Sequence, residues 1–246
     1  MDLQAILDAG GPWEQARIIG DQLLIQGDCL EAMPTLGKVD AVLTDPPYGI
    51  GVDRAMAANS GTKYGKAAAA KGDYRASGWD DVPIGKPHID AMLNAGPSVV
   101  MFGGNYFALP PARCWLIWDK ENGGNEFADC ELAWTNLDRP VRIIRHMWNG
   151  MLRKGQEARH GHPTQKPVAV MEWCLGFLLD ARTILDPFAG SFTTAVACQR
   201  LGRQSISIEL DPDYYQIGLK RVQEAVDNPP LFVPEIKKPV QQGFDI

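Results

Sequence analysis

The stretch that decides the fold is Thr183-Ile184-Leu185-Asp186-Pro187-Phe188-Ala189-Gly190-Ser191. It begins as a short apolar run, which predicts a buried strand, and passes directly into a turn that contains glycine. The next residues, Phe192–Leu201, predict a helix that ends at Gly202. A second strand, Gln204–Glu209, follows and ends in an acid. This strand–helix–strand unit predicts an α/β protein with a mostly parallel sheet.

The turn and the terminal acid of this unit indicate a ligand. An acid about 20 residues after such a turn has the spacing of the acid that binds ribose hydroxyls in dinucleotide sites. The three glycines that serve a pyrophosphate are missing, since only Gly190 is present, and Asp186 would repel phosphate. A ligand with a ribose, a positive centre and no phosphate fits better, which points to S-adenosylmethionine. An ordinary crossover with a surface acid at Glu209 is the alternative.

A second apolar run, Val39–Thr44, ends at the tetrapeptide Asp45-Pro46-Pro47-Tyr48. Proline cannot donate a ladder hydrogen bond, so the strand stops there. Ligands bind at the carboxyl ends of strands in open α/β sheets. The cluster suits a planar group with an amine, because Asp45 and the Pro46 carbonyl accept the amine hydrogens while Tyr48 stacks on the ring. A plain Pro-Pro turn capped by an aspartate is the other interpretation.

Two further segments accompany these motifs, His162–Pro167 before a helix and Gln26-Gly27-Asp28-Cys29 upstream of the first strand motif. Together the four blocks resemble those of amino-directed DNA methyltransferases of the permuted (β) group. The catalytic block precedes the cofactor block by about 140 residues, as in that group. The resemblance covers most of residues 21–48 and 160–227. It implies a Rossmann-like methyltransferase fold with circularly permuted motif order: a doubly wound, mostly parallel seven-stranded sheet with a small recognition insertion.

The resemblance also implies a reaction and the residues that perform it. A methyl group would pass from S-adenosylmethionine directly to the exocyclic amine of a flipped adenine in DNA, as in restriction-modification systems. Adenine is expected over the cytosine N4 amine, because relatives that act on cytosine more often carry serine at position 45. Lys166 could equally serve a DNA phosphate. The implied catalytic residues are Asp45, Pro46, Pro47 and Tyr48, and the implied cofactor contacts are Asp28, Thr164, Lys166, Asp186, Phe188, Ala189, Gly190 and Glu209.

Charge is distributed unevenly along the chain. Residues 139–166 contain seven basic residues and one acid, a net charge of +6, whereas the whole chain carries −6 and the remainder therefore −12. Clustered positive charge is typical of phosphate contact, whereas a solvated face normally mixes both signs. The resemblance implies a target-recognition segment between the catalytic and cofactor blocks, and residues 119–160 are its candidate, with double-stranded DNA as the partner. Its candidate contacts are Arg139, Arg142, Arg145, Arg153, Lys154 and Arg159.

The rest of the chain predicts further elements of one domain over residues 1–246. Residues 49–80 lack apolar periodicity and predict a flexible loop over the active site. Phe102-Gly103-Gly104-Asn105 is interpreted as a pocket wall, and Trp118, Trp134 and Trp148 as core residues. Strands are expected at 23–25, 98–102, 114–118, 131–135 and 141–148, and helices at 29–36, 86–94, 167–178 and from 211 onward.

Composition excludes several classes of protein. No apolar run approaches the length of a membrane span, and the first four residues are not those of a signal peptide. Five cysteines without paired spacing predict reduced thiols in the cytoplasm and no zinc or other metal. The sequence contains no Pro-Cys, which argues against methylation of cytosine carbon-5 through a covalent thiolate intermediate.

The sequence leaves two other classes of function open. An RNA- or protein-directed methyltransferase can share the Pro-Pro-Tyr chemistry, although such enzymes usually place the cofactor block first. A non-catalytic DNA-binding module would bind DNA without releasing S-adenosylhomocysteine. A homodimer is a further expectation, because one small recognition segment would need a partner's help to hold duplex DNA.

Overall fold

The computed structural model describes residues 1–51, 54, 78, 80–122, 128–148, 157 and 164–229. Within these residues the centre is a nine-stranded sheet in the order β1-β2-β9-β8-β3-β4-β6-β5-β7. Five of its neighbouring pairs are parallel and three are antiparallel. The predicted α/β class with a mostly parallel sheet is confirmed, but the sheet has nine strands and not seven.

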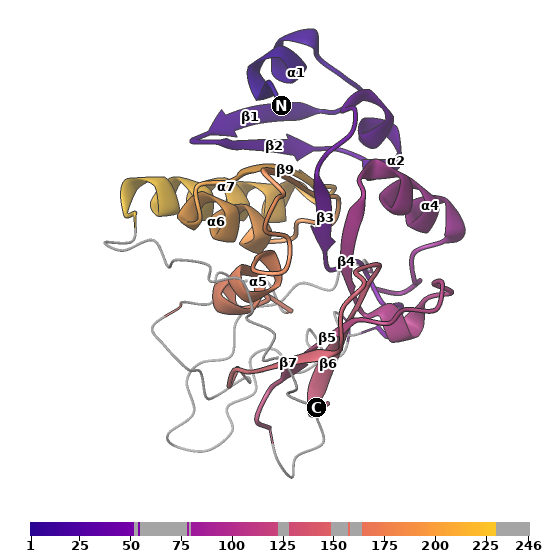
Figure 1. Cartoon of the computed structure of the whole chain (residues 1–246). Helices are drawn as coiled ribbons and strands as arrows, with labels where there is room; N and C mark the ends of the chain where they lie inside the picture. The colour runs from indigo at the N-terminus through magenta and orange to yellow at the C-terminus, as the bar shows by residue number, and fades with distance from the viewer. Residues whose placement is uncertain are drawn as a thin grey trace.

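The elements alternate along the chain as Figure 1 shows. The strands are β1 (Gln15–Ile19), β2 (Gln22–Gln26), β3 (Ala41–Thr44), β4 (Ser98–Phe102), β5 (Trp115–Asp119), β6 (Cys130–Thr135), β7 (Arg142–Arg145), β8 (Thr183–Asp186) and β9 (Gln204–Glu209). The helices are α1 (Leu3–Ala9), α2 (Cys29–Ala32), α4 (Lys86–Ala95), α5 (Val168–Leu175), α6 (Thr193–Arg200) and α7 (Pro212–Asp227), with short 3-10 turns η1 (Met33–Thr35) and η2 (Gly104–Tyr106). None of these helices is long and apolar enough to cross a membrane.

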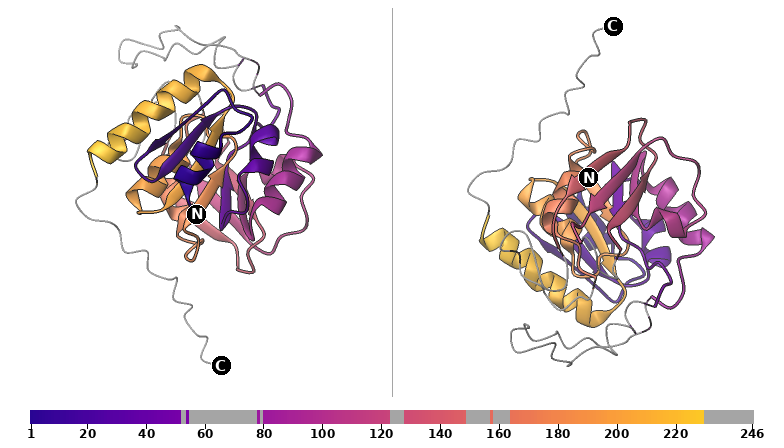
Figure 2. Two further views of the ribbon diagram at one scale, coloured as in Figure 1. Left: turned by 90° about the horizontal axis from the view of Figure 1, so that it is seen from above. Right: turned by 90° about the horizontal axis from the view of Figure 1, so that it is seen from below.

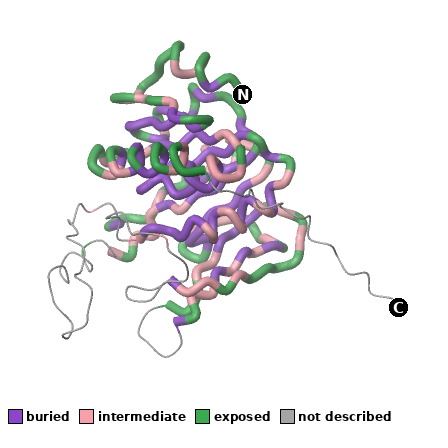
Figure 3. Tube along the Cα trace, turned by 90° about the vertical axis from the view of Figure 1, so that its left-hand side faces the viewer, coloured by how far each residue is buried: buried purple, intermediate pink, exposed green. Residues whose placement is uncertain are grey.

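Helices cover both faces of the sheet. In Figures 1 and 2, α5, α6 and α7 lie on one side and α2 and α4 on the other. Successive side chains of a strand point to opposite faces, so Leu43 joins the core under α5–α7 while Val42 joins the core under α2 and α4. Burial is concentrated in the strands between these layers, as Figure 3 shows. The three tryptophans predicted as core, Trp118, Trp134 and Trp148, are buried.

The site lies where the chain reverses its direction of winding across the sheet. From β3 the chain continues to β4 on one side, whereas β8 continues to β9 on the other, so the switch point falls between β3 and β8. These strands are parallel, with Ala41 opposite Ile184, and both therefore end at the same edge. Their ends are joined directly, because the Thr44 hydroxyl donates a hydrogen bond of 2.7 Å to Asp186 Oδ1. In open α/β sheets this is the position at which ligands bind.

The turn before α6 adopts an unusual backbone conformation at Phe192. Its φ of 59° and ψ of 38° lie in the left-handed region, which residues other than glycine seldom occupy. The ring is fully buried and meets the ring of Tyr215 edge-on, with centroids 5.9 Å apart. A Cβ added to Gly218 on α7 would lie 2.1 Å from Phe192 Cδ2. Gly218 is therefore required by the close approach of this ring.

Replacing Gly218 with alanine should test that packing. In an exposed helix this change stabilises by about 1 kcal/mol. Here the added methyl group meets the buried ring, and overpacking of this kind costs about 1–3 kcal/mol. We expect the thermal unfolding midpoint to fall by about 2–4 °C per kcal/mol lost. The matched control is Gly85→Ala, whose new Cβ would make an ordinary contact of 3.5 Å with Pro87. An unchanged or raised midpoint for Gly218→Ala would show that the ring gives way without cost.

Candidate active site

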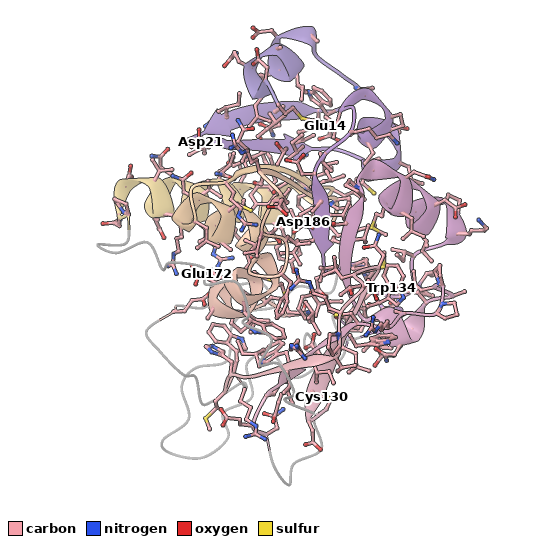
Figure 4. The ribbon with its side chains drawn as sticks, viewed as in Figure 1. Glu14, Asp21, Cys130, Trp134, Glu172 and Asp186 are labelled. Atoms are coloured by element: carbon pink, nitrogen blue, oxygen red, sulfur yellow. The ribbon has the colours of Figure 1, made fainter. Side chains whose placement is uncertain are left out.

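A cavity of about 960 Å³ opens at the carboxyl ends of β3, β8 and β9. Figure 4 shows Asp186 near the centre of the molecule, beside β3. All the predicted catalytic and cofactor residues line this one cavity, although the two main blocks are far apart in sequence: Asp28, Asp45, Pro46, Pro47, Tyr48, Thr164, Lys166, Asp186, Phe188, Ala189, Gly190 and Glu209.

Both carboxylate oxygens of Asp45 have partners. Oδ1 accepts a hydrogen bond of 2.6 Å from the Tyr48 hydroxyl, and Oδ2 forms an ion pair with the ammonium of Lys166. Burial raises the pKa of Asp45, and the Lys166 ammonium opposes that rise. The pKa of Tyr48 is raised well above its ordinary value by burial and by the adjacent carboxylate of Asp45. Tyr48 therefore keeps its proton and donates a hydrogen bond to Asp45.

Two further charged side chains belong to the same group, and the sequence analysis missed both. Glu131 on β6 forms ion pairs with Lys166 at 2.9 Å and with Lys120 at 2.5 Å, and accepts a hydrogen bond of 3.3 Å from the Tyr48 hydroxyl. Burial alone would raise the pKa of Glu131, but the two ammonium groups outweigh it and lower the pKa to about 2. The charge pattern assigned residues 119–160 to DNA. The antiparallel pairing of β5 with β6 brings Lys120 and Glu131 to the catalytic edge, and none of the sequence motifs includes either residue.

Two neighbouring residues hold Tyr48 in position. The ring of Tyr106 stacks on it, with centroids 5.0 Å apart. Gly103 has a φ of 69°, and a Cβ there would lie 2.1 Å from Tyr48 Cε1, so the predicted pocket wall must be glycine at this point.

Asp80 fixes the backbone that follows the catalytic tetrapeptide. Pro46 and Pro47 have no N–H, and the next two amides, those of Tyr48 and Gly49, both donate to Asp80 Oδ1, at 2.8 and 2.9 Å. Asp80 is itself buried. It closes the base of the 49–80 segment, most of which lies outside the described residues.

The opposite end of the cavity is acidic. Asp186 Oδ1 accepts from Thr44 and from the Phe188 amide, and its Oδ2 accepts from Thr194 at 2.5 Å. Glu209 accepts from the amides of Gly190 at 2.7 Å and Asp211 at 2.8 Å. Burial raises the pKa of Asp186 to about 6 and that of Glu209 to about 8, although these hydrogen bonds favour the ionised forms.

Comparison with known proteins places the chain in a family. The family model described as "DNA methylase" matches residues 117–220. "Putative methylase YubD" of Escherichia coli (strain K12) is 31% identical over 234 residues, which cover 86% of this chain and 97% of YubD. The chain belongs to the DNA methylase family.

Two further proteins, one relative and one solved structure, are similar to this methylase. The type II methyltransferase M2.DpnII of Streptococcus pneumoniae is 42% identical over 82 residues, which are 32% of the methylase and 31% of that protein. The solved M1.HpyAVI–SAM complex is 20% identical and covers 80% of the methylase and 97% of its own chain, with a TM-score of 0.45. A TM-score this low supports no conclusion about the site.

The cavity of the methylase suits S-adenosylmethionine, the cofactor of this family. Its acidic end gathers Asp28, Asp186 and Asp211, whose carboxylates would repel a phosphate but attract the positively charged sulfur of a sulfonium, beside the protonated Glu209. Of the described lining residues, the lysines are Lys120 and Lys166, and both are paired with acids at the catalytic end. Lys166 thus contacts Asp45 and Glu131 in this structure, and the contact with the methionine carboxylate expected for it and for Thr164 stays a prediction.

The structure describes three of the six predicted DNA contacts of the methylase. Arg142 and Arg145 are exposed on the edge strand β7, and Arg139 precedes it. Arg142 and Arg145 are three residues apart in a strand and therefore point to opposite faces of the sheet. Arg153, Lys154 and Arg159 lie outside the described residues. Glu157, from the same segment, accepts from the Val168 amide at 2.8 Å and pairs with the buried Arg221.

The raised pKa of Glu209 predicts a pH dependence of stability. Its pKa is about 8 in the folded methylase against an ordinary value of 4.5, so the folded chain holds this proton more tightly than the unfolded chain. The stabilisation is therefore present below the ordinary value and is lost as pH rises through about 8. Without cofactor, we expect the wild-type unfolding midpoint to fall between about pH 5 and about pH 9 by more than that of Glu209→Gln, which has no proton to lose. Parallel curves for the two proteins would contradict the assignment.

Proposed function

We propose that this methylase transfers a methyl group from S-adenosylmethionine to the exocyclic amine of adenine, at a specific sequence in double-stranded DNA. DNA methylation is the activity of the family, and the choice of adenine and the residue roles are the proposal. The observation that carries it is the junction of β3 and β8, where Thr44 binds Asp186 and so joins the catalytic tetrapeptide to the cofactor block.

At the cofactor end, the residues have separate tasks. When bound, S-adenosylmethionine supplies an electrophilic methyl group. Glu209 would bind the ribose hydroxyls and Asp28 the adenine ring, as the resemblance implies. Asp186, Phe188, Ala189 and Gly190 would hold the methionine portion. Two backbone amides already orient the carboxylate of Glu209, so little ordering is needed when a ligand arrives.

At the catalytic end, Asp45 and the Pro46 carbonyl accept the two amine hydrogens of the target base. The lone pair of that amine is delocalised into the ring, and these acceptors stabilise the positive charge that develops as the nitrogen becomes tetrahedral. The methylated nitrogen then loses one proton, and Asp45 is the base within reach. Extruding the base from the duplex costs a few kcal/mol. Stacking beside Tyr48, worth about 1–3 kcal/mol per base, offsets part of that cost.

The remaining proposals concern DNA and assembly. Exposed Arg142 and Arg145, with Arg139, would contact phosphates at the edge of the sheet, and Arg153, Lys154 and Arg159 would extend this contact. Val141, just before the edge strand β7, and Ile143 on it are 48% and 55% exposed, which suits a homodimer. The five cysteines are free thiols, in keeping with a cytoplasmic enzyme. Light scattering at several protein concentrations tests the homodimer.

Incubation with DNA and radiolabelled cofactor tests the function. Unmethylated duplex DNA, RNA and a protein mixture serve as acceptors, and the modified nucleoside is identified after digestion. We expect N6-methyladenine from duplex DNA. N4-methylcytosine would correct the base, and label in RNA or protein would overturn the proposed substrate.

A further inference from the structure

A chain of alternating charges runs through the catalytic end of the cavity. Lys120 contacts Glu131, Glu131 contacts Lys166, and Lys166 contacts Asp45. Their side chains are only 19%, 18%, 6% and 20% exposed, in that order. Two ammonium groups and two carboxylates leave the cluster with no net charge. Glu131 lies on β6, whereas Asp45 follows β3, Lys120 follows β5 and Lys166 precedes α5.

The ammonium of Lys166 opposes the proposed chemistry as it stands. Asp45 must face the positive charge that develops on the target amine, yet Lys166 holds its own positive charge against Asp45 Oδ2. Methyl transfer is favoured when this ammonium moves away from Asp45. Lys166 can do so without losing its buried charge partner, because Glu131 Oε2 already lies 2.9 Å from its ammonium. Without a second acceptor, the buried ammonium of Lys166 would stay paired with Asp45, since separating a buried ion pair is costly.

We propose that Glu131 is a positioning residue that takes over the ammonium of Lys166 when the target amine binds Asp45. Lys120, on the other oxygen of Glu131, balances its charge in both states. The inference rests on the proposed function, because it concerns how the same amine reaches Asp45. In the resting state Lys166 is paired with Asp45, and Glu131 is the group that allows this ion pair to separate.

Net charge distinguishes this role from a merely structural one. Glu131→Gln leaves Asp45 with two lysines, a net +1 that tightens the Lys166–Asp45 pair and opposes a developing cation. Lys166→Met leaves Asp45 and Glu131 with Lys120 alone, a net −1 that raises the pKa of Asp45 further. The double variant Glu131→Gln with Lys166→Met is neutral again, and nothing then covers Asp45 Oδ2. A structural role predicts that the double variant is worse than either single variant.

The experiment compares kcat for methyl transfer to duplex DNA in these four proteins across pH. We expect Glu131→Gln to lower kcat about 100-fold, the scale of one lost electrostatic group in an active site. The double variant should recover about tenfold of this loss. For Lys166→Met, the acid limb of the pH profile should move to higher pH. Glu172→Gln, which removes a carboxylate of α5 that is paired with Arg200 of α6, should leave kcat unchanged.

Two measurements distinguish this role of Glu131 from an effect on folding or on cofactor binding. Unfolding midpoints confirm that each variant is folded at the assay temperature, and calorimetry with S-adenosylhomocysteine should give wild-type affinity for Glu131→Gln. A double variant no more active than Glu131→Gln would overturn the inference while the proposed function stands. A wild-type protein that methylates no DNA would overturn the proposed function, and the inference with it.

Discussion

Replacing Asp45 with alanine is expected to lower kcat for methyl transfer by at least about 10³-fold, the largest effect of any single change in this protein. In the proposed mechanism, this carboxylate accepts the amine hydrogen and faces the developing positive charge. The fold should survive the change, because Lys166 keeps its contact with Glu131 and Tyr48 keeps its contact with the same side chain. The measurement is single-turnover transfer of labelled methyl groups to duplex DNA.

A matched pair of variants separates charge from shape at this position. Asp45→Asn keeps one acceptor oxygen and should lose most of the activity as well, because the negative charge is gone. Asp90→Ala removes an exposed carboxylate that pairs with Lys86 within α4 and should keep wild-type kcat. Wild-type transfer by Asp45→Ala would mean that another residue accepts the amine hydrogens.

The second large effect is expected for Asp186→Ala, which should weaken binding of S-adenosylhomocysteine by about 100-fold. Asp186 accepts three hydrogen bonds, from Thr44, Thr194 and the Phe188 amide. Each buried donor left without an acceptor costs about 1–3 kcal/mol, so the turn that carries Phe188 and Gly190 should move to find other partners. Titration calorimetry measures the affinity directly.

Stability must be measured together with affinity for this variant, since the hydrogen bond from Thr44 to Asp186 also joins β3 to β8. Asp186→Asn keeps one carbonyl oxygen and should fall between the wild type and Asp186→Ala in both measurements. An Asp186→Ala protein that is destabilised but binds S-adenosylhomocysteine normally would restrict this residue to holding the strands together.

Local patterns in the sequence predicted the strand–helix–strand unit well. β8 and β9 occupy the residues expected, because short apolar runs bounded by a turn or an acid specify them without help from the rest of the chain. α1 and β1 were not predicted. In β1, Ala16 and Ile18 alternate with the exposed Gln15 and Arg17, but this run is too short to predict a strand by itself, and antiparallel pairing with β2 stabilises it.

Motifs in the sequence predicted most residues of the candidate site but not all the contacts between them. Motif spacing brought Asp45 and Asp186 to one cavity, and their neighbouring ends are indeed bonded. It could not show that Lys166 pairs with Asp45, because that contact joins residues 121 positions apart through the packing of α5 against the sheet. Lys120 and Glu131 were missed for the same reason, since a charge count along the chain cannot distinguish a buried ion pair from a surface that meets DNA.

The pairing of β3 with β8 has a consequence for how the protein forms. Thr44 and Asp186 are 142 positions apart, so the central pair of the sheet depends on one of the most distant contacts along the chain. Contacts of such long range demand a large loss of chain entropy before they give any stability, and they slow folding. During synthesis, β3 must therefore wait, with one edge unpaired, until β8 has been made. We expect the pocket to be among the last features to assemble, and the newly made chain to need protection from aggregation until then.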